Sequence, residues 1–229
     1  MNETDGQATV AAPKSWHMIR AMGGIGLLCG LLIVLTYEAT LPTITRKKAE
    51  YLEKAIYKVL PGAQSSRAYR LKDDGSFEPF SGDVAKEQVV YAGFDVQNQL
   101  VGIAVEASGQ GFQDAIRILY GYSPEKQVVV GIAVLESKET PGLGDKIEKD
   151  PGFLKNFEAL DVSLTADGAQ IAHPIVPVKH GTKANPWEID AITGATISSK
   201  AIANILQQST GVWIPLIAGN TERFRKSGE

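Results

Sequence analysis

Cysteine is nearly absent from this chain of 229 residues, and its scarcity excludes several kinds of site. Cys29 is the only cysteine, so the chain can form no internal disulfide and no site with several thiolate ligands. The histidines, His17, His173 and His180, are scattered along the sequence and form no ligand set with a neighbouring Cys or His. We therefore expect no metal site. The chemistry of the chain must come from an organic cofactor or from carboxylate and hydroxyl groups.

An excess of basic residues is also missing. The formal net charge is -3 and the isoelectric point about 5.7, whereas a nucleic-acid-binding domain usually carries a basic patch. We therefore expect no nucleic acid as a partner. Hydrophobic residues make up 44% of the chain, which is enough for a packed core, and the length suits one domain of usual size with an attachment.

One segment lacks charge altogether. Residues 21–37 contain no charged side chain, and as a helix they would extend about 26 Å, close to the thickness of the hydrocarbon layer. Trp16 and Tyr37 stand at the two ends, where aromatic interface anchors are common. The pattern predicts a transmembrane helix at residues 19–41. The alternative is a cleaved signal peptide, but the apolar run is long and no clear Ala-x-Ala site follows it.

The segments around this span complete the N-terminal part of the chain. Residues 1–18 are expected to form a tail, and residues 42–62 a linker helix that ends at Pro61-Gly62. The apolar positions of the linker recur on one helical face: Leu52, Ala55, Ile56 and Val59.

Residues 63–229 predict one α+β domain with an antiparallel sheet and a few helices. Alternating or continuous apolar runs separated by turn residues predict two hairpins and a later short strand. Residues 65–86 are polar and are expected to be irregular. The phrase Val-Gly-Ile-Ala-Val occurs twice, which reflects either an internal duplication or chance reuse of good strand residues. The predicted strands are 89–94, 100–107, 116–120, 127–135 and 187–189.

Residues 190–199 read Asp-Ala-Ile-Thr-Gly-Ala-Thr-Ile-Ser-Ser and predict a glycine turn followed by an amphipathic helix of about three turns. Thr193 or Thr196 is the expected N-cap. The first amides of such a helix suit an anion, phosphate above all, although an ordinary capped helix has the same local pattern. The predicted apolar face is Ile197, Ala201, Ile202, Ile205 and Leu206, and the predicted polar face is Ser198, Ser199, Asn204, Gln207 and Gln208.

The run Thr193-Gly194-Ala195-Thr196, preceded by Asp190, resembles the flavinylation motif of FMN-binding domains. The resemblance implies that Thr196 is esterified to the phosphate of FMN by a dedicated flavin transferase that uses FAD. It also implies that Asp190, Thr193, Gly194 and Ala195 present the Thr196 hydroxyl and shape the phosphate turn.

Residues 139–144 read Glu-Thr-Pro-Gly-Leu-Gly, in which the proline fixes one dihedral angle and the glycines allow close backbone approach. By local chemistry this is a loop. A dinucleotide site is disfavoured because the third glycine and the βαβ pattern are missing. The run resembles the FMN-binding G subunit of the Rnf electron-transport complex and the C subunit of the sodium-pumping NADH:quinone reductase, in which the loop lies against the flavin. The cofactor-binding residues that this implies are Glu139, Thr140, Pro141, Gly142, Leu143 and Gly144.

Both motifs, in this order behind one anchor, make the chain similar to the family of Rnf G subunits over nearly its whole length. The resemblance implies a covalently flavinylated electron carrier in a complex that couples electron transfer between ferredoxin and NAD to sodium or proton movement. It implies other membrane and iron–sulfur subunits as partners, with no residue acting as a general acid or base. It places the tail in the cytoplasm and the FMN-binding domain on the periplasmic side of a bacterial inner membrane.

Other functions remain open. The chain is alternatively a counterpart of the C subunit of the quinone reductase, or a periplasmic sensor or assembly module without flavin. A hydrolase or transferase acting through Ser198, Ser199 or Lys200 is disfavoured, because adjacent residues point apart on a helix and no Ser-x-x-Lys spacing exists. Trp187 either stacks near the flavin or belongs to the core.

Overall fold

The computed structural model describes residues 15–82 and 87–226. It divides the chain into two units, Met1–Ala49 and Glu50–Glu229. Helix α1 (Ser15–Val59) supplies the described part of the first unit and continues into the second.

In the first unit every described residue of α1 is exposed. Within the described part of the chain, α1 is the one helix that is long and apolar enough to cross a membrane. The segments predicted as a transmembrane helix at 19–41 and a linker helix at 42–62 form one continuous helix, with Pro42 inside it. The predicted tail at 1–18 falls largely outside the described residues.

Three threonines near Pro42 bond to their own helix. The hydroxyls of Thr36, Thr40 and Thr45 donate to backbone carbonyls of the preceding turn at 2.7, 2.8 and 3.0 Å. A proline inside a helix leaves one carbonyl without its usual donor, and membrane helices tolerate this when nearby groups adapt. Because these hydroxyls have partners within the helix, they add little cost to an apolar environment.

The second unit is built on a seven-stranded antiparallel sheet with the order β2-β1-β3-β4-β5-β6-β7. Both predicted hairpins are confirmed, as is the α+β class. A separate parallel pair joins β8 to β9, so the short strand predicted at 187–189 is also present. The strands are β1 (Ser65–Leu71), β2 (Phe77–Pro79), β3 (Val89–Phe94), β4 (Leu100–Gln110), β5 (Ala115–Ser123), β6 (Val128–Glu136), β7 (Leu160–Asp161), β8 (Val176–Val178) and β9 (Glu188–Asp190).

The prediction that residues 65–86 are irregular was wrong, because β1 and β2 lie there. β1 pairs with β3 on one edge and with β2 on the other. Tyr69 is the buried side chain of β1. The nearby arginines, Arg67 and Arg70, make the segment polar, so its sequence shows no clear alternation of apolar and polar residues. Arg70 also forms an ion pair with Glu78 across the β1–β2 pair. Charged cross-strand partners on an exposed edge resemble a polar loop in sequence.

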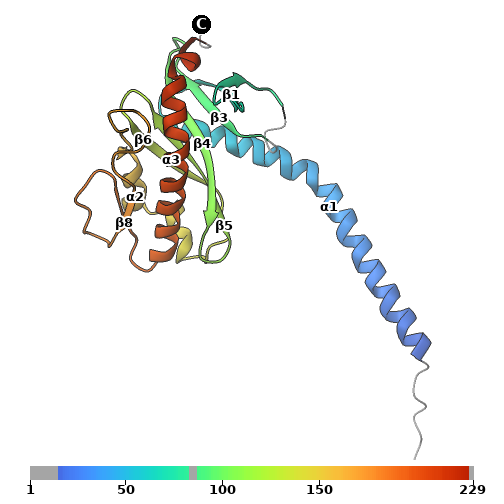
Figure 1. Cartoon of the computed structure of the whole chain (residues 1–229). Helices are drawn as coiled ribbons and strands as arrows, with labels where there is room; N and C mark the ends of the chain where they lie inside the picture. The colour runs from blue at the N-terminus through green and yellow to red at the C-terminus, as the bar shows by residue number, and fades with distance from the viewer. Residues whose placement is uncertain (1–14, 83–86, 227–229) are drawn as a thin grey trace, which may run out of the picture. The chain divides into compact units, whose positions relative to one another are not determined.

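Helix α3 (Thr196–Lys226) packs along one face of this sheet (Figure 1). It is much longer than the predicted three turns, and it continues through Pro215. Its distal part buries Ile214, Ile217 and Phe224. The ring of Phe224 lies 5.0 Å from the ring of Tyr69, in an edge-to-face arrangement. The second half of the helix is thus stabilised by the strand that the sequence pattern missed.

The C-terminal end of α1 packs on the opposite face of the sheet, around Val59 and Leu60. The chain approaches the strands closely there because glycines remove side chains from the surface beneath it. A Cβ at Gly121 would lie 2.0 Å from the Val59 carbonyl oxygen, and one at Gly102 would lie 2.9 Å from Leu60 Cδ2. Gly131 contacts the same turn. The repeated Val-Gly-Ile-Ala-Val phrase therefore has a shared packing requirement on β4 and β6, whatever its origin.

Short helical segments follow β6. They are η2 (Gly144–Glu148), α2 (Pro151–Leu154) and η3 (Lys155–Phe157). Asp150 caps α2, since its carboxylate accepts a hydrogen bond from the Phe153 N–H at 2.9 Å. The same segments carry buried Phe153 and Phe157 into the core on the α3 side.

Candidate functional site

A glycine turn joins β9 to α3. The N–H of Ala195 donates to the carbonyl of Ile192 at 3.0 Å and closes the turn. Gly194 has a φ of +83°, in the left-handed region that residues with a Cβ rarely adopt. The turn predicted at Thr193-Gly194 is thus confirmed, and glycine is needed there.

Helix α3 begins at Thr196, and the Ser199 N–H donates its first intrahelical bond to the Ala195 carbonyl at 2.9 Å. Ala195 is therefore the N-cap residue, and the prediction of Thr193 or Thr196 as the cap was wrong. The three amides before Ser199 have no acceptor within the helix and lie at its positive end. Thr193, Gly194 and Thr196 are exposed, whereas Ala195 is buried.

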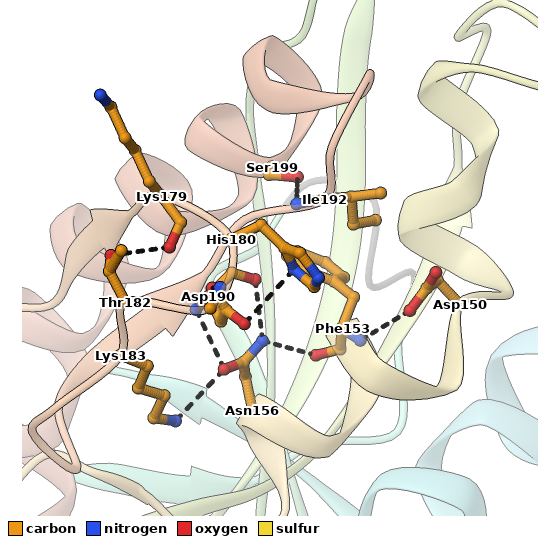
Figure 2. A network of polar contacts seen from close by, with 11 residues as sticks. Asp150, Phe153, Asn156, Lys179, His180, Thr182, Lys183, Asp190, Ile192 and Ser199 are labelled. Atoms are coloured by element: carbon orange, nitrogen blue, oxygen red, sulfur yellow. Dashed lines mark hydrogen bonds and ion pairs between the residues drawn. The ribbon is translucent and has the colours of Figure 1, made fainter.

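Ser199 holds this turn from the inside, where a capping threonine was expected. Its hydroxyl oxygen accepts a hydrogen bond from the Ile192 N–H at 3.1 Å (Figure 2). The same hydroxyl donates to the Ala195 carbonyl at 2.9 Å. The side chain is fully buried, so both bonds are shielded from water. The turn at residues 192–196, called the acceptor turn below, is thus bonded through Ile192 and Ala195 to the first turn of α3.

The face of α3 that meets the sheet is rotated from the prediction. Ser198 and Ser199 are buried, whereas Ile197 is 57% exposed. Burial of the two serines is tolerated because both hydroxyls have hydrogen-bond partners. The remaining assignments hold: Ala201, Ile202, Ile205 and Leu206 are buried, and Asn204, Gln207 and Gln208 are exposed.

Glu139 connects three segments of the candidate site. It is only 6% exposed, and its Oε1 accepts hydrogen bonds from the N–H groups of Phe112 at 2.8 Å and Gln113 at 3.1 Å. Its Oε2 accepts a hydrogen bond from the Ser198 hydroxyl. The β4–β5 turn, the 139–144 loop and the start of α3 therefore meet at one carboxylate. Both carboxylate oxygens accept hydrogen bonds from protein groups, so the role of Glu139 is to hold these three segments together.

Two glycines leave room for this carboxylate. A Cβ at Gly144 would lie 2.5 Å from Glu139 Oε2 and 2.9 Å from Ser198 Oγ. A Cβ at Gly111 would lie 2.5 Å from Glu139 Oε1. The glycine that ends the 139–144 motif is therefore required for close packing against the first residue of the same motif.

The middle of the 139–144 loop is a turn directed toward solvent. The carbonyl of Thr140 accepts a hydrogen bond from the Leu143 N–H at 3.1 Å, and Gly142 has a φ of +78°. The Gly142 N–H donates to Asp145 Oδ1 at 2.7 Å. The hydrogen bond from Lys149, followed by that from Gly142, lowers the pKa of the Asp145 carboxyl. Pro141, Gly142 and Leu143 are exposed.

Large apolar side chains are exposed on each of the three segments that Glu139 connects. Phe112 is 60% exposed in the β4–β5 turn, Leu143 is 52% exposed in the loop, and Ile197 is 57% exposed in the first turn of α3. Each neighbours a group that bonds or packs against the Glu139 carboxylate. Phe112, Leu143 and Ile197 therefore present exposed apolar side chains on the three segments that meet at Glu139, and Ile197 directly follows the exposed Thr196.

Asp190 lies at the end of β9, and its carboxylate points toward the preceding loop (Figure 2). Oδ1 accepts a hydrogen bond from the Gly181 N–H at 2.7 Å, and Oδ2 lies 3.4 Å from His180 Nδ1. The backbone of Asp190 bonds to the side chain of Asn156. Asp190 thus holds loop 180–181 against β9, six residues before Thr196.

Trp187 has a partner that the sequence did not suggest. Its ring stacks on that of His173, with centroids 4.0 Å apart and an interplanar angle of 16°. Trp187 is half-buried and His173 is exposed. In this structure the tryptophan therefore belongs to the surface of the loop region, outside the main core.

Comparisons with known proteins identify the family of this chain. Residues 111–210 match the family described as the FMN-binding domain, a stretch that includes both motifs. The chain is 30% identical to the G subunit of the ion-translocating oxidoreductase complex of Methanosarcina acetivorans, over 84% of this chain and 90% of that protein. The protein belongs to the family of G subunits of ion-translocating oxidoreductase complexes.

Other members and solved structures extend this result. Another family member, the G subunit of the Na(+)-translocating ferredoxin:NAD(+) oxidoreductase complex of Acetobacterium woodii, is 30% identical over 86% of this chain and 93% of that protein. The crystal structure of Shewanella oneidensis NqrC has 19% identity and a TM-score of 0.56, covering 80% of this chain and 98% of that one. The C subunit of the Na(+)-translocating NADH-quinone reductase of Parabacteroides distasonis has 21% identity and a TM-score of 0.55, covering 75% and 95%. These structures share the fold.

Membership in this family makes the protein a redox subunit of an ion-translocating oxidoreductase complex, with an FMN-binding domain. Sequence reasoning found the exposed threonine and the loop, but it missed the groups that support them. Asn156 and the amides of Phe112 and Gln113 belong to no motif. Ser199 lies three residues after Thr196 and could be found in the sequence. Its role could not be predicted, because that role depends on which face of α3 is buried.

Proposed function

We propose that this subunit is a covalently flavinylated electron carrier, with FMN attached through its phosphate to the hydroxyl of Thr196. The observation that carries the proposal is the placement of the Thr-Gly-Ala-Thr run. Thr196 is exposed, lies within the matched FMN-binding domain and is the first residue of a helix of 31 residues. A phosphodiester at this position would face the free amides of the first helical turn, which favour negative charge.

The attachment step balances with FAD as donor and a flavin transferase as catalyst. The Thr196 oxygen forms a bond to the phosphorus on the flavin side of FAD, and the phosphoanhydride bond to AMP breaks. AMP leaves, and the hydroxyl proton passes to a base of the transferase. No electrons are exchanged. This chain contributes an accessible hydroxyl on a turn that Ser199 and Gly194 hold in shape.

The residues around Thr196 fit FMN. Donor amides at the helix start suit its phosphate, and the exposed side chains of Phe112, Leu143 and Ile197 offer apolar surface to its ring system. Bound FMN supplies the ability to accept and release one or two electrons. The chain itself fixes the cofactor, limits its access to water and holds the 139–144 loop beside it through Glu139.

The relatives indicate the setting of this electron transfer. Because family members are named for ferredoxin:NAD(+) oxidoreductase complexes that translocate sodium or protons, we propose that this subunit works in such a complex. Its partners are then other membrane and iron–sulfur subunits, together with the flavin transferase during maturation. We place residues 19–41 in a bacterial inner membrane, residues 1–18 in the cytoplasm and residues 63–229 in the periplasm, with residues 42–62 as the link.

Labelling from one side of the membrane tests this orientation. Val96 is 74% exposed at the β3–β4 turn, so Val96→Cys in a Cys29→Ser background offers one accessible thiol. A membrane-impermeant maleimide should label it in intact spheroplasts as fully as after lysis. Labelling that requires lysis would place the domain in the cytoplasm.

Mass spectrometry tests the flavin link. The full chain from its native membrane should carry one FMN-sized addition on the peptide that contains Thr196. The addition should be absent from Thr196→Val and present in the matched control Thr182→Val, which alters an exposed threonine outside the turn. An unmodified Thr196 from flavin-replete cells would overturn the proposal and favour an assembly or sensor module. Modification of Thr193 would move the site.

A further inference from the structure

A buried asparagine binds the backbone at the entrance to the acceptor turn. Asn156, in η3, is only 5% exposed. Its Oδ1 accepts a hydrogen bond from the Asp190 N–H at 3.0 Å, and its Nδ2 donates to the Asp190 carbonyl at 3.1 Å (Figure 2). Nδ2 also donates to the Phe153 carbonyl at 2.9 Å. One side-chain amide therefore binds both polar groups of one peptide residue, 34 positions away.

This arrangement provides hydrogen-bond partners for the backbone groups on one edge of β9. The other edge of β9 pairs with β8, and the next residue, Ala191, donates its N–H to the Val178 carbonyl at 3.1 Å. The N–H and carbonyl of Asp190 face away from that pairing and need partners, because unpaired backbone groups are costly when shielded from water. An asparagine amide presents one acceptor and one donor at about the spacing of a peptide group. The Asn156 side chain thus makes the two hydrogen bonds that a neighbouring strand would otherwise make to Asp190.

The surrounding donors and acceptors select one orientation of the amide. Nδ2 faces two carbonyls, and Oδ1 faces two donors, the Asp190 N–H and the Lys183 ammonium at 3.2 Å. A flipped amide would set its hydrogens against both donors. Burial lowers the pKa of the Lys183 ammonium, and the nearby carboxylates of Asp190 and Glu188 oppose that shift.

The position of Asp190 is transmitted along the chain to the acceptor turn. Ala191 is bonded to β8, and Ile192 is bonded through its N–H to Ser199 Oγ and through its carbonyl to the Ala195 N–H. Ala191 and Ile192 are both buried. Between the amide of Asn156 and the turn, each residue is thus held by a hydrogen bond, and a shift at Asp190 would move the start of α3.

We propose that Asn156 is a positioning residue for flavin attachment: it keeps the acceptor turn in the one conformation that the flavin transferase binds. This inference rests on the proposed function. Without the clamp the domain keeps its core, but the competent conformation of the turn is populated for only part of the time. The apparent affinity of the transferase for this chain is then multiplied by the fraction of chains in the competent conformation, whereas the rate at saturation is preserved.

Steady-state flavin transfer to the full chain in detergent tests the inference, with FAD, a bacterial flavin transferase and intact-mass detection. Asn156→Ala should raise the KM for the acceptor chain by about ten-fold and leave kcat within about two-fold of wild type. Asn204→Ala, which removes an exposed asparagine of α3, should match wild type. Lys183→Met, which keeps the amide clamp but removes its charged neighbour, should also match wild type. Hydrogen exchange should be faster at 191–198 in Asn156→Ala alone.

The outcomes separate the two proposals. If the wild-type chain is not modified, the proposed function fails. If wild type is modified and Asn156→Ala has the same KM, the positioning role fails. A reduced fraction of modifiable chain with unchanged KM would also overturn it, because that pattern indicates a loss of folded protein. An effect of equal size in Lys183→Met would assign the role to the charge.

Discussion

At the scale of single residues, Glu139 supports the greatest part of the candidate site. Replacing it with alanine leaves two backbone amides and the Ser198 hydroxyl without their partner. We expect Glu139→Ala to lower the free energy of unfolding by about 3 kcal/mol, and Glu139→Gln, which keeps an acceptor and a donor, by only about 1 kcal/mol. Urea titration of the full chain in detergent, followed by tryptophan fluorescence, measures both.

A matched control is available close by. Glu158 is an exposed glutamate, and Glu158→Ala should stay within about 0.5 kcal/mol of wild type. Equal losses for Glu139→Ala and Glu158→Ala would contradict the role of Glu139 as the connection between the three segments.

The residues of the candidate site differ in how far sequence could predict them. Thr196 and Glu139 are parts of contiguous runs, so a motif is enough to find them. Asn156 has no local pattern, because its function depends on a contact with β9 that forms only in the folded chain. Ser198 and Ile197 were assigned to the wrong faces for a related reason. Hydrophobicity predicts burial poorly where a serine has a carboxylate partner inside the protein.

At the scale of secondary structure elements, the close contact between α1 and the sheet depends on glycine. A Cβ at Gly121 would lie 2.0 Å from the Val59 carbonyl oxygen, so Gly121→Ala must displace the end of α1. We expect a loss of about 3 kcal/mol in the free energy of unfolding. Gly219→Ala makes the same chemical change inside α3, where nothing lies within 4 Å, and should stabilise the helix by up to about 1 kcal/mol. Chemical denaturation that ranks the two variants equally would contradict the contact.

Elements with strong local patterns were predicted well, and those that depend on distant partners were not. β3 to β6 combine apolar runs with turn residues, and they appeared where expected. β1 was missed because its pairing partners, β2 and β3, supply most of its order. The second half of α3 lies beyond the predicted three turns and continues through Pro215, and there Phe224 packs on β1 and favours continuation. Tertiary contacts outweighed local propensity in both cases.

At the scale of the whole domain, ionised carboxylates hold the loops while apolar packing holds the sheet. Each of these carboxylates accepts hydrogen bonds from side chains or backbone amides, from its own loop or, for Asp114, first from Lys138 after β6, and these bonds hold its pKa below the ordinary value. A lowered pKa in the folded state means that ionisation favours folding. This contribution is complete above the unfolded pKa, and it is lost as the pH falls through the folded value. The carboxylates concerned are Asp74, Asp114, Asp145, Asp167 and Glu188.

Acid should therefore loosen the loops before it affects the core, and Glu188 provides the test. Hydrogen bonds from the Ala184 N–H and then from Asn185 lower the pKa of Glu188 from its ordinary value of 4.5, and they fix the loop that leads into β9. Glu188→Gln should lower the melting temperature of the full chain at pH 7. The difference from wild type should shrink as the pH falls below about 4.5, since the wild-type carboxyl is then protonated and resembles the amide. Circular dichroism melts between pH 7 and pH 3 measure it. A difference that stays constant over this range would mean that the loop is held by the shape of the side chain and not by its charge.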